Sequence, residues 1–300
     1  MSADIRFDGQ VVIVTGAGGG LGRSHALEFA RRGAKVVVND LGGAVDGSGG
    51  SSAAADAVVA EITAAGGEAI ADGASVTSDA GVAAMVERAM SKWGRIDVLV
   101  ANAGILRDKS FAKMEIADFA AVVDVHLMGT VKPLKAMWEI MRAQNYGRVV
   151  VTTSSTGLYG NFGQSNYGAA KLALVGLMNT LKLEGSKHDI RINAISPVAA
   201  TRMTDTLMPP DMLARLGPEH VTPGVIYLAS REAPSGAILT AGAGVFALAQ
   251  MVETEGAYLG AAASAEAVRD HWARITDPAG AEAYPAGMGQ TQKILRKSNA

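Results

Sequence analysis

The sequence predicts an α/β fold: a doubly wound, Rossmann-type parallel sheet of seven strands, followed by a C-terminal extension. Two observations lead to this class. Seven short apolar runs alternate with helical patterns between residues 10 and 241, and the runs are continuous in Val, Ile and Ala, as in strands buried on both faces. Strand–helix alternation requires right-handed crossovers, and such crossovers build an open parallel sheet.

The expected elements follow one another from the N-terminus. Each apolar run is expected to form one strand, and each helical pattern between two runs is expected to form one helix. The strands are expected at residues 10–15, 34–39, 68–72, 95–101, 147–153, 190–195 and 237–241, and the helices at residues 20–32, 51–65, 79–93, 115–143, 164–187 and 221–230.

Two segments stand apart from this alternation. Residues 42–50 are rich in Gly and Ser, and we interpret them as a surface loop rather than a binding element. Residues 250–300 lie beyond the last expected strand and are rich in Ala and Gly. They contain one helix start at Ser264, which is suited to cap the helix, with Glu266 in the first turn. We therefore expect a domain at 1–249 and an extension at 250–300 that packs on its own or a neighbouring subunit.

The first expected strand runs into a glycine-rich turn that opens a helix. Gly16, Gly20 and Gly22 let the chain turn tightly and bring its amides close to a pyrophosphate at the helix N-terminus. Leu21 lies between the last two glycines and is expected at the same site. The second strand ends at Asp40, where an acidic residue suits both ribose hydroxyls of an adenosine. The order strand, turn, helix, strand and Asp predicts a dinucleotide site.

A second set of residues follows the fifth expected strand. Tyr167 and Lys171 are four residues apart, so they share one face of a helix. A free phenol has a pKa of about 10, and a fixed ammonium beside it is expected to lower that pKa. Ser154, at the end of the strand, is placed to hold a substrate hydroxyl or carbonyl against the phenol. These residues are suited to proton transfer in an alcohol–ketone interconversion.

The glycine spacing Thr-Gly-x-x-x-Gly-x-Gly together with Tyr-x-x-x-Lys resembles the short-chain dehydrogenase/reductase family, over roughly residues 5–248. Asn102, Ala103 and Gly104 after the fourth strand extend the resemblance. The segments 38–43, 102–108 and others most resemble one branch, the (3R)-hydroxyacyl-CoA dehydrogenase part of peroxisomal multifunctional enzyme type 2, also known as a 17β-hydroxysteroid dehydrogenase. The resemblance implies that Asn102-Ala103-Gly104 steadies the central sheet beside the adenine.

The resemblance also implies a role for each site residue. Tyr167 would be the general base in oxidation and the general acid in reduction, Lys171 would hold the nicotinamide ribose, and Ser154 would orient the substrate oxygen. His126 stands where most relatives have a catalytic Asn. Either its imidazole keeps the proton relay, or the relay water is held by the backbone alone and the residue is only packed in the helix.

The cofactor loops carry the remaining implied contacts. Ser75 and Val76 stand where many relatives have Asp-Val against the adenine, so that contact would fall to the Ser hydroxyl or the backbone. Pro197 is followed by Val where relatives have Gly, so the backbone conformation of the nicotinamide loop is not predicted. Thr201 is expected to reach the carboxamide.

The choice of cofactor can be argued from charge. A 2′-phosphate needs a nearby Arg or Lys and would be repelled by Asp40. Gly19 stands where relatives that use NADP often have a basic residue, and Leu41 follows Asp40, so neither position supplies a cation. The sequence therefore predicts NAD.

Composition narrows the class of protein. A formal charge of −2 and a 49% hydrophobic content are those of an ordinary soluble protein and exclude a strongly basic nucleic-acid surface. The absence of Cys excludes disulfides and thiol nucleophiles, and the five His lack ligand spacing, so no metal site is expected. The sequence contains no run of about 20 apolar residues, so no membrane span is expected. Without a secretory signal or a C-terminal Ser-Lys-Leu, we expect a cytoplasmic location.

Several functions stay open on this scaffold. We expect an NAD-dependent oxidoreductase that acts on the 3-hydroxy/3-oxo carbon of an acyl-CoA thioester. A 17β-hydroxysteroid or sterol-side-chain acyl-CoA dehydrogenase is the nearest rival, an acyl-carrier-protein ketoreductase is less favoured, and a catalytically silent NAD-binding sensor is the alternative of another class. Residues 200–218 are expected to close over an apolar substrate. The family's pairing of the helices at 115–143 and 164–187 implies a homodimer or homotetramer.

Overall fold

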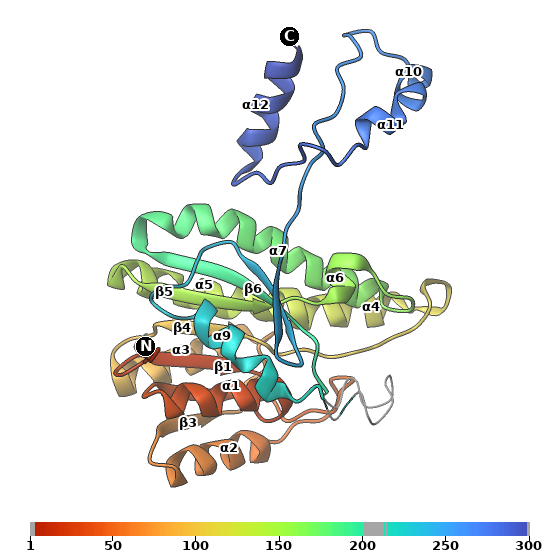
Figure 1. Ribbon diagram of the computed structural model, residues 1–300. Coiled ribbons are helices and arrows are strands. Elements are labelled where there is room, and N and C mark those ends of the chain that lie inside the picture. Colours follow the sequence, from red (N-terminus) through yellow and green to blue (C-terminus); the bar gives the residue numbers. More distant parts are fainter. Residues whose placement is uncertain (1–3, 201–212, 214, 299–300) are drawn as a thin grey trace. The chain divides into compact units, whose positions relative to one another are not determined.

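The computed structural model describes residues 4–200, 213 and 215–298 (Figure 1). The chain forms two compact units, residues 1–248 and residues 249–300. The first unit contains an eight-stranded sheet in the order β3-β2-β1-β4-β5-β6-β7-β8. The order reverses beside β1, and in open α/β sheets ligands bind outside the carboxyl ends of the strands at such a switch point.

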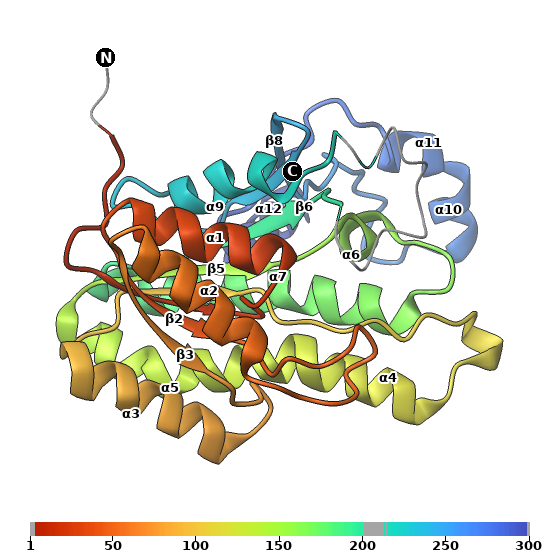
Figure 2. The ribbon, with the colours of Figure 1, turned by 90° about the horizontal axis from the view of Figure 1, so that it is seen from below.

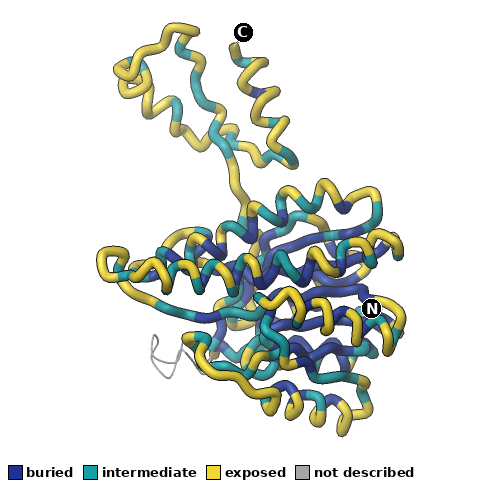
Figure 3. Tube along the Cα trace, turned by 180° about the vertical axis from the view of Figure 1, so that it is seen from behind, coloured by how far each residue is buried: buried dark blue, intermediate teal, exposed yellow. Residues whose placement is uncertain are grey.

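The strands confirm the predicted parallel α/β sheet. All six strand pairs from β3 to β7 are parallel, and each of these seven strands falls within three residues of its expected bounds. Buried residues concentrate in the central strands β1, β2, β4, β5 and β6 (Figure 3). The strands are β1 (Val11–Thr15), β2 (Lys35–Asn39), β3 (Glu68–Asp72), β4 (Val98–Ala101), β5 (Gly147–Thr152), β6 (Ile190–Pro197), β7 (Ile238–Gly242) and β8 (Val245–Ala249).

The prediction of seven strands is wrong by one, because β8 adds an eighth. Ala243 and Gly244, with φ of 50° and 78°, form the two-residue turn between β7 and β8. A turn with two positive φ values is typical of a tight hairpin, so β8 runs back along β7. Val245, Phe246 and Leu248 of β8 are exposed at this edge of the sheet.

Helices cover both faces of the sheet (Figure 2). On one face α1 packs on α2 and α9, and on the other α3 packs on α5 and α4 packs on α7. The helices of the first unit are α1 (Gly20–Arg31), α2 (Ala53–Ala64), α3 (Asp79–Trp93), α4 (Ile116–Val123), α5 (Gly129–Gln144), α6 (Ser155–Tyr159), α7 (Ser165–Gly185) and α9 (Thr222–Leu228), with short 3₁₀ turns η1 (Phe111–Lys113), η3 (Ser186–His188) and η4 (Pro218–His220).

The long helix expected at 115–143 is interrupted. A π-helical turn, η2 (Asp124–Met128), separates α4 from α5 and carries His126. π-turns inside helices are rare and frequent at functional sites. The sequence prediction also lacked α6, a short helix that begins immediately after Ser154.

The second unit is small and helical. Its helices are α10 (Ala265–Asp270), α11 (Trp272–Ile275) and α12 (Gly287–Ser298). Ser264 caps α10 as predicted, since its hydroxyl accepts a hydrogen bond from the amide of Ala267 at 3.2 Å. Lys293 is buried and pairs with Glu253 at 3.0 Å. No helix in the described part of the chain is long and apolar enough to cross a membrane.

Candidate active site

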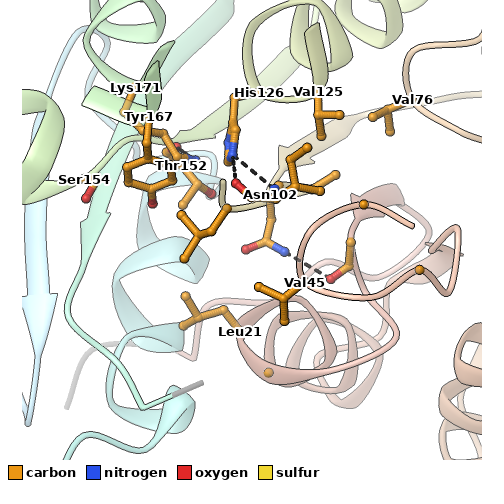
Figure 4. A pocket seen from close by; sticks show the side chains of 18 of the residues that line it. Leu21, Val45, Val76, Asn102, Val125, His126, Thr152, Ser154, Tyr167 and Lys171 are labelled. Atoms are coloured by element: carbon orange, nitrogen blue, oxygen red, sulfur yellow. Dashed lines mark hydrogen bonds between the residues drawn. The ribbon is translucent and has the colours of Figure 1, made fainter. Parts of the chain in front are cut away.

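A cavity of about 400 Å³ lies at the carboxyl ends of β1, β2, β4, β5 and β6 (Figure 4). It brings together most of the residues that the sequence predicts for the site. Gly22 lies in α1 and is buried behind the turn. The predicted residues that line the cavity are Gly16, Gly20, Leu21, Asp40, Ser75, Val76, Asn102, Ala103, Gly104, His126, Ser154, Tyr167, Lys171 and Pro197.

The glycine-rich turn after β1 is held against the end of β4. The amide of Asn102 donates from Nδ2 to the carbonyls of Thr15 and Gly16, each at 3.1 Å. Gly16 has a φ of 64°, and a Cβ there would lie 2.8 Å from Cα of Ala103. A Cβ on Gly22 would collide with the carbonyl oxygen of Gly16. The turn therefore needs glycine at both positions to keep the backbone close to the cavity.

Asp40 sits at the end of β2 with both carboxylate oxygens in use. Oδ2 accepts a hydrogen bond from the amide of Gly18 at 2.7 Å, and Oδ1 accepts one from the amide of Gly42 at 2.6 Å. A carboxylate has about four acceptor positions, so each oxygen keeps capacity for a ligand hydroxyl. Asp40 thus ties the glycine turn to the loop that follows β2.

The loop after β2 is the main element that the sequence interpretation missed. Residues 43–47, which we call the strap, cross to the segment after β4, and Gly43, Ala44, Val45 and Gly47 line the cavity. The amide of Leu106 donates to the carbonyl of Val45 at 3.0 Å, and Nε of Arg107 donates to the carbonyl of Asp46 at 3.0 Å. Because β1 lies between β2 and β4, the strap passes over the glycine-rich turn. The interpretation as a surface loop did not place these residues at the cavity, which four of them line.

Ser75 and Val76 form the wall beyond β3. The hydroxyl of Ser75 is paired with the hydroxyl of Thr77 at 2.9 Å, so it is already engaged within its own loop. Val76 is buried, and a Cβ on Gly129 would lie 2.6 Å from its Cγ2. This end of the cavity is apolar and close-packed, as suits a planar base.

Ser154, Tyr167 and Lys171 converge at the opposite end (Figure 4). Ser154 caps α6, and its Oγ accepts a hydrogen bond from the amide of Thr156 at 3.1 Å. Tyr167 lies in the first turn of α7, and its ring faces the same end of the cavity as Ser154. Nζ of Lys171 donates to the carbonyl of Thr152 at 2.6 Å and lies 5.5 Å from the centre of the Tyr167 ring. The phenol thus lies between a hydroxyl and an amine.

The electrostatics of this group differ from the expectation. Burial raises the pKa of Tyr167 above 10, the hydrogen bond from Ser154 lowers it, and the carboxylate of Asp108 raises it. Burial also lowers the pKa of Lys171 to about 7. The predicted depression of the phenol pKa by a fixed ammonium is therefore wrong for the chain alone, because the buried amine does not keep a full charge at neutral pH.

His126 is buried in η2 against the edge of Tyr167. Its Nε2 lies 2.8 Å from the carbonyl oxygen of Ile105 and 3.1 Å from its amide nitrogen, and the tautomer decides which bond forms. The two rings meet edge to face with centroids 5.1 Å apart. Burial first, and then the nearby Lys171, lower the pKa of His126 well below 6.5, so the imidazole is neutral. A Cβ on Gly104 would overlap its ring, so the close packing needs glycine there.

A polar network that the sequence did not predict joins the segments around Tyr167. The side chain of Gln164 donates from Nε2 to Asp108 at 2.6 Å. Its Oε1 accepts hydrogen bonds from Thr156 at 2.9 Å and from Asn161 at 3.0 Å. Gln164 lies just before α7, the helix that carries Tyr167, and Thr156 lies in α6, the helix that follows Ser154. The network therefore holds α6 and α7 together. No motif spacing marks it, because its members come from three separate segments.

The nicotinamide loop is described only in part. Pro197 ends β6 and lines the cavity, and Val198 donates its amide to the carbonyl of Ala241 at 2.8 Å. Thr201, and most of the segment 200–218 expected to close over the substrate, lie outside the described residues. Among the described residues no group of three or more His, Cys, Asp or Glu is arranged to hold a metal ion.

Comparisons with known proteins agree with this geometry. The family profile described as short chain dehydrogenase matches residues 10–211. A short-chain type dehydrogenase/reductase of Mycobacterium tuberculosis is 50% identical over 274 residues, covering 91% of this chain and 96% of the relative. Peroxisomal multifunctional enzyme type 2 of Mus musculus is 48% identical over 281 residues, covering 92% of this chain and 38% of the relative.

Solved structures give the same result. Full-length peroxisomal multifunctional enzyme type 2 from Drosophila melanogaster superposes with a TM-score of 0.83 at 38% identity, covering 98% of this chain and 50% of that one. A 7α-hydroxysteroid dehydrogenase complexed with NADH and 7-oxoglycochenodeoxycholic acid superposes with a TM-score of 0.71 at 30% identity. The match covers 80% of this chain and 95% of that one. The chain thus spans between 31% and 61% of the length of the multifunctional enzymes it matches.

The relatives contradict one expectation. Relatives at 45–48% identity from Dictyostelium discoideum, Mus musculus, Saccharomyces cerevisiae, Neurospora crassa and Drosophila melanogaster are all named as peroxisomal enzymes. The predicted cytoplasmic location is contradicted by these names, although the mycobacterial relative carries no such label. The prediction depended on a missing terminal address, which says nothing about a chain that matches only part of longer proteins.

Proposed function

The chain belongs to the short-chain dehydrogenase/reductase family, and from that premise we propose that it transfers a hydride between NAD and the 3-hydroxy/3-oxo carbon of an acyl-CoA thioester. The family assignment makes it an oxidoreductase that acts on hydroxyl groups with a nicotinamide cofactor. The observation that carries the proposal is the meeting of Ser154, Tyr167 and Lys171 in the cavity that the glycine-rich turn and Asp40 line.

The residues of the cavity fit a nicotinamide dinucleotide. The glycine-rich turn leaves no Cβ between the backbone and the cavity at Gly16, as a pyrophosphate needs. Asp40 offers free acceptor capacity at the adenosine end, and the apolar wall at Val76 suits the base. Lys171 is the one Lys or Arg among the described residues that line the cavity, and it lies at the opposite end. The adenosine end therefore has no described cation for a 2′-phosphate, which supports NAD over NADP.

The proposed reaction divides between the cofactor and three side chains. The glycine-rich turn, Asp40 and Lys171 would hold NAD, which would supply the hydride acceptor in oxidation and the hydride donor in reduction. Tyr167 removes the hydroxyl proton as the carbon–hydrogen bond breaks, and Ser154 holds the same oxygen by a hydrogen bond. Lys171 would hold the nicotinamide ribose, and burial lowers its pKa to about 7.

The proposed substrate rests on similarity to the multifunctional enzymes. One of them, from Saccharomyces cerevisiae, is named a hydratase-dehydrogenase-epimerase, and this chain covers 31% of its length. The resemblance noted above assigns the dehydrogenase part to 3-hydroxyacyl-CoA. The hydroxysteroid alternative is favoured by the 7α-hydroxysteroid dehydrogenase, whose structure holds a bile acid. The alternative of a silent sensor has less support, because all three reacting side chains are present and line the same cavity.

A substrate panel tests this proposal. NADH formation is followed at 340 nm with 3-hydroxyacyl-CoAs of several chain lengths, 17β- and 7α-hydroxysteroids, and NAD. We expect the acyl-CoA thioesters to give the highest kcat/KM. Faster turnover of the steroids would replace the substrate assignment, and no turnover despite tight NAD binding would favour the sensor.

We further propose that the protein is a homodimer or homotetramer. Leu172 and Leu183 on α7 are large, apolar and about half exposed, as expected of a helix that pairs with a second copy. Docking of the extension at 249–300 on its own or a neighbouring subunit is part of the same proposal. Sedimentation of the whole chain measures the assembly directly.

Replacing His126 tests whether its imidazole serves a proton relay. We expect His126→Ala to lower kcat at least about tenfold and to shift the pH profile. Loss of the buried ring should also reduce the free energy of unfolding by about 2–5 kcal/mol. His126→Asn supplies the amide that most relatives have and serves as the matched control. Reduced stability with unchanged kcat and pH profile would show that His126 is only packed.

Loosening the strap should speed cofactor release. Arg107→Ala removes the hydrogen bond to the strap at Asp46, and one such bond is worth roughly 0.5–1.5 kcal/mol, or about 2- to 12-fold in rate. NADH dissociation is measured by stopped-flow fluorescence. Lys109→Ala is the matched control, because Lys109 shares the partner Asp118 with Arg107 and makes no bond to the strap. Equal dissociation rates in Arg107→Ala and wild type would mean that the strap does not hold the cofactor.

A further inference from the structure

Three buried side-chain atoms in the described part of the chain have no hydrogen-bond partner: Oδ2 of Asp72, Nδ1 of His126 and Oγ1 of Thr152. Asp72 lies in an ion pair with Arg88. The other two belong to residues that line the cavity. His126 already has the candidate role discussed above, whereas neither motif nor mechanism accounts for the hydroxyl of Thr152.

The backbone around Thr152 fixes which way its side chain faces. The next residue, Thr153, donates its hydroxyl to the carbonyl of Lys171 at 2.7 Å, so its side chain points toward α7. Successive side chains on a strand point to opposite faces, so Thr152 points away from α7. It is paired with Ile195 of β6, two residues before Pro197, and so lies on the nicotinamide-loop side of the cavity.

Thr152 is also attached to the group that is expected to hold the cofactor. Its carbonyl accepts the hydrogen bond from Nζ of Lys171 at 2.6 Å. Figure 4 shows Thr152 close to Lys171 and Tyr167 and away from Leu21 and Val45. Asp40, at the adenosine end, follows β2, which is separated from β5 by β1 and β4. A ligand group that reaches Thr152 therefore belongs to the nicotinamide half of the cofactor.

Packing alone does not explain a threonine at this position. Thr152 is 6% exposed, and valine has the same shape and an equal preference for strands. A buried hydroxyl without a partner costs free energy that valine would not cost. Because the hydroxyl is present despite this cost in free energy, we expect it to form a hydrogen bond with a ligand that enters the cavity.

We propose that Thr152 is a cofactor-positioning residue, whose hydroxyl hydrogen-bonds a ribose hydroxyl or the carboxamide of the nicotinamide nucleoside. The inference rests on the proposed use of a nicotinamide cofactor. Together with Lys171, the side chain of Thr152 fixes the nicotinamide nucleoside from the β5 side.

Ligand affinity of the whole chain tests this role. Thr152→Val keeps the shape and removes the hydroxyl, and Thr152→Ser keeps a hydroxyl. Titration calorimetry with NADH, ADP-ribose and ADP separates the parts of the cofactor. We expect Thr152→Val to weaken NADH binding roughly 2- to 12-fold, the value of one hydrogen bond, and to leave ADP binding unchanged. Thr152→Ser should keep most of the affinity. A matching loss for ADP-ribose places the contact at the ribose, and a normal ADP-ribose affinity places it at the carboxamide.

Thermal unfolding without ligand supplies a second readout. Removing an unpartnered hydroxyl should leave the Tm of the free protein unchanged or higher, while NADH should raise the Tm of Thr152→Val less than that of wild type. Wild-type affinity for NADH in Thr152→Val, an equal loss for ADP, or a lower Tm of the free variant would each overturn the inference. If wild type itself bound neither NADH nor NADPH, the proposed function would fail instead.

Discussion

Replacing Tyr167 with phenylalanine should lower kcat by at least about 10²- to 10⁴-fold, the usual contribution of general acid–base catalysis, and leave NADH affinity nearly unchanged. The reason is that only the hydroxyl takes part in proton transfer, whereas the ring packs against His126 with centroids 5.1 Å apart. Phenylalanine keeps that packing. It removes the hydroxyl, the group that accepts the substrate proton.

The measurement is kcat at saturating substrate, with NADH affinity from fluorescence titration as the control for folding. Ser154→Ala is the companion variant and should also slow turnover, because it loses a hydrogen bond to the reacting oxygen. Retention of more than about a tenth of the wild-type rate in Tyr167→Phe, well above the range for such losses, would remove Tyr167 from the proposed role.

NAD should exceed NADP by at least about 100-fold in kcat/KM. A charge-assisted hydrogen bond from a ribose hydroxyl to Asp40 is worth roughly 1.5–3 kcal/mol, or about 10- to 150-fold. Repulsion between the carboxylate and a 2′-phosphate widens the difference. The amides of Gly18 and Gly42 hold both oxygens of Asp40 in place, so the carboxylate cannot swing away from the phosphate.

Adding a cation is the cleanest way to test the origin of this preference. Asp40→Ala removes the ribose contact but also frees two backbone amides, so its effect is mixed. Gly19→Arg leaves Asp40 untouched, and no atom lies within 4 Å of a Cβ built at Gly19. Gly19 has an extended backbone, with φ of −166°, which any residue adopts. We expect Gly19→Arg and Leu41→Arg each to reduce the ratio of kcat/KM for NAD to that for NADP, because the added cation can pair with the 2′-phosphate. Comparable kcat/KM values for the two cofactors in wild type would overturn the role of Asp40.

The sequence predicted the elements whose signals are local. Continuous runs such as residues 11–15 and 147–152 fix buried parallel strands within a few residues. The hairpin strand β8 was missed because its five apolar residues lie at an exposed edge of the sheet. They do not alternate with polar residues, so the sequence does not show which face would be buried. The π-turn η2 was missed because its residues suit an ordinary helix. A contact 21 residues away, between His126 and Ile105, accompanies the distortion.

The same division holds for the site. Gly16, Asp40, Tyr167 and Lys171 were placed by motif spacing and lie together in the structure. The strap and the hydroxyl of Thr152 were not predicted, because their positions depend on contacts between distant strands. The pKa of Tyr167 was predicted in the wrong direction for a related reason. Spacing shows that an amine is near, but only the fold shows how deeply both groups are buried.

The most direct test of the proposed function uses the two enantiomers of one substrate. Initial rates are measured at 340 nm for wild type and Tyr167→Phe, with (3R)- and (3S)-3-hydroxyacyl-CoA of one medium chain length and saturating NAD. We predict NADH formation by wild type from the (3R) enantiomer, little from the (3S) enantiomer, and a loss of at least about 100-fold in Tyr167→Phe. NADH formation from neither enantiomer, in a wild-type protein shown to bind NADH, would contradict the assignment of this chain as a 3-hydroxyacyl-CoA dehydrogenase.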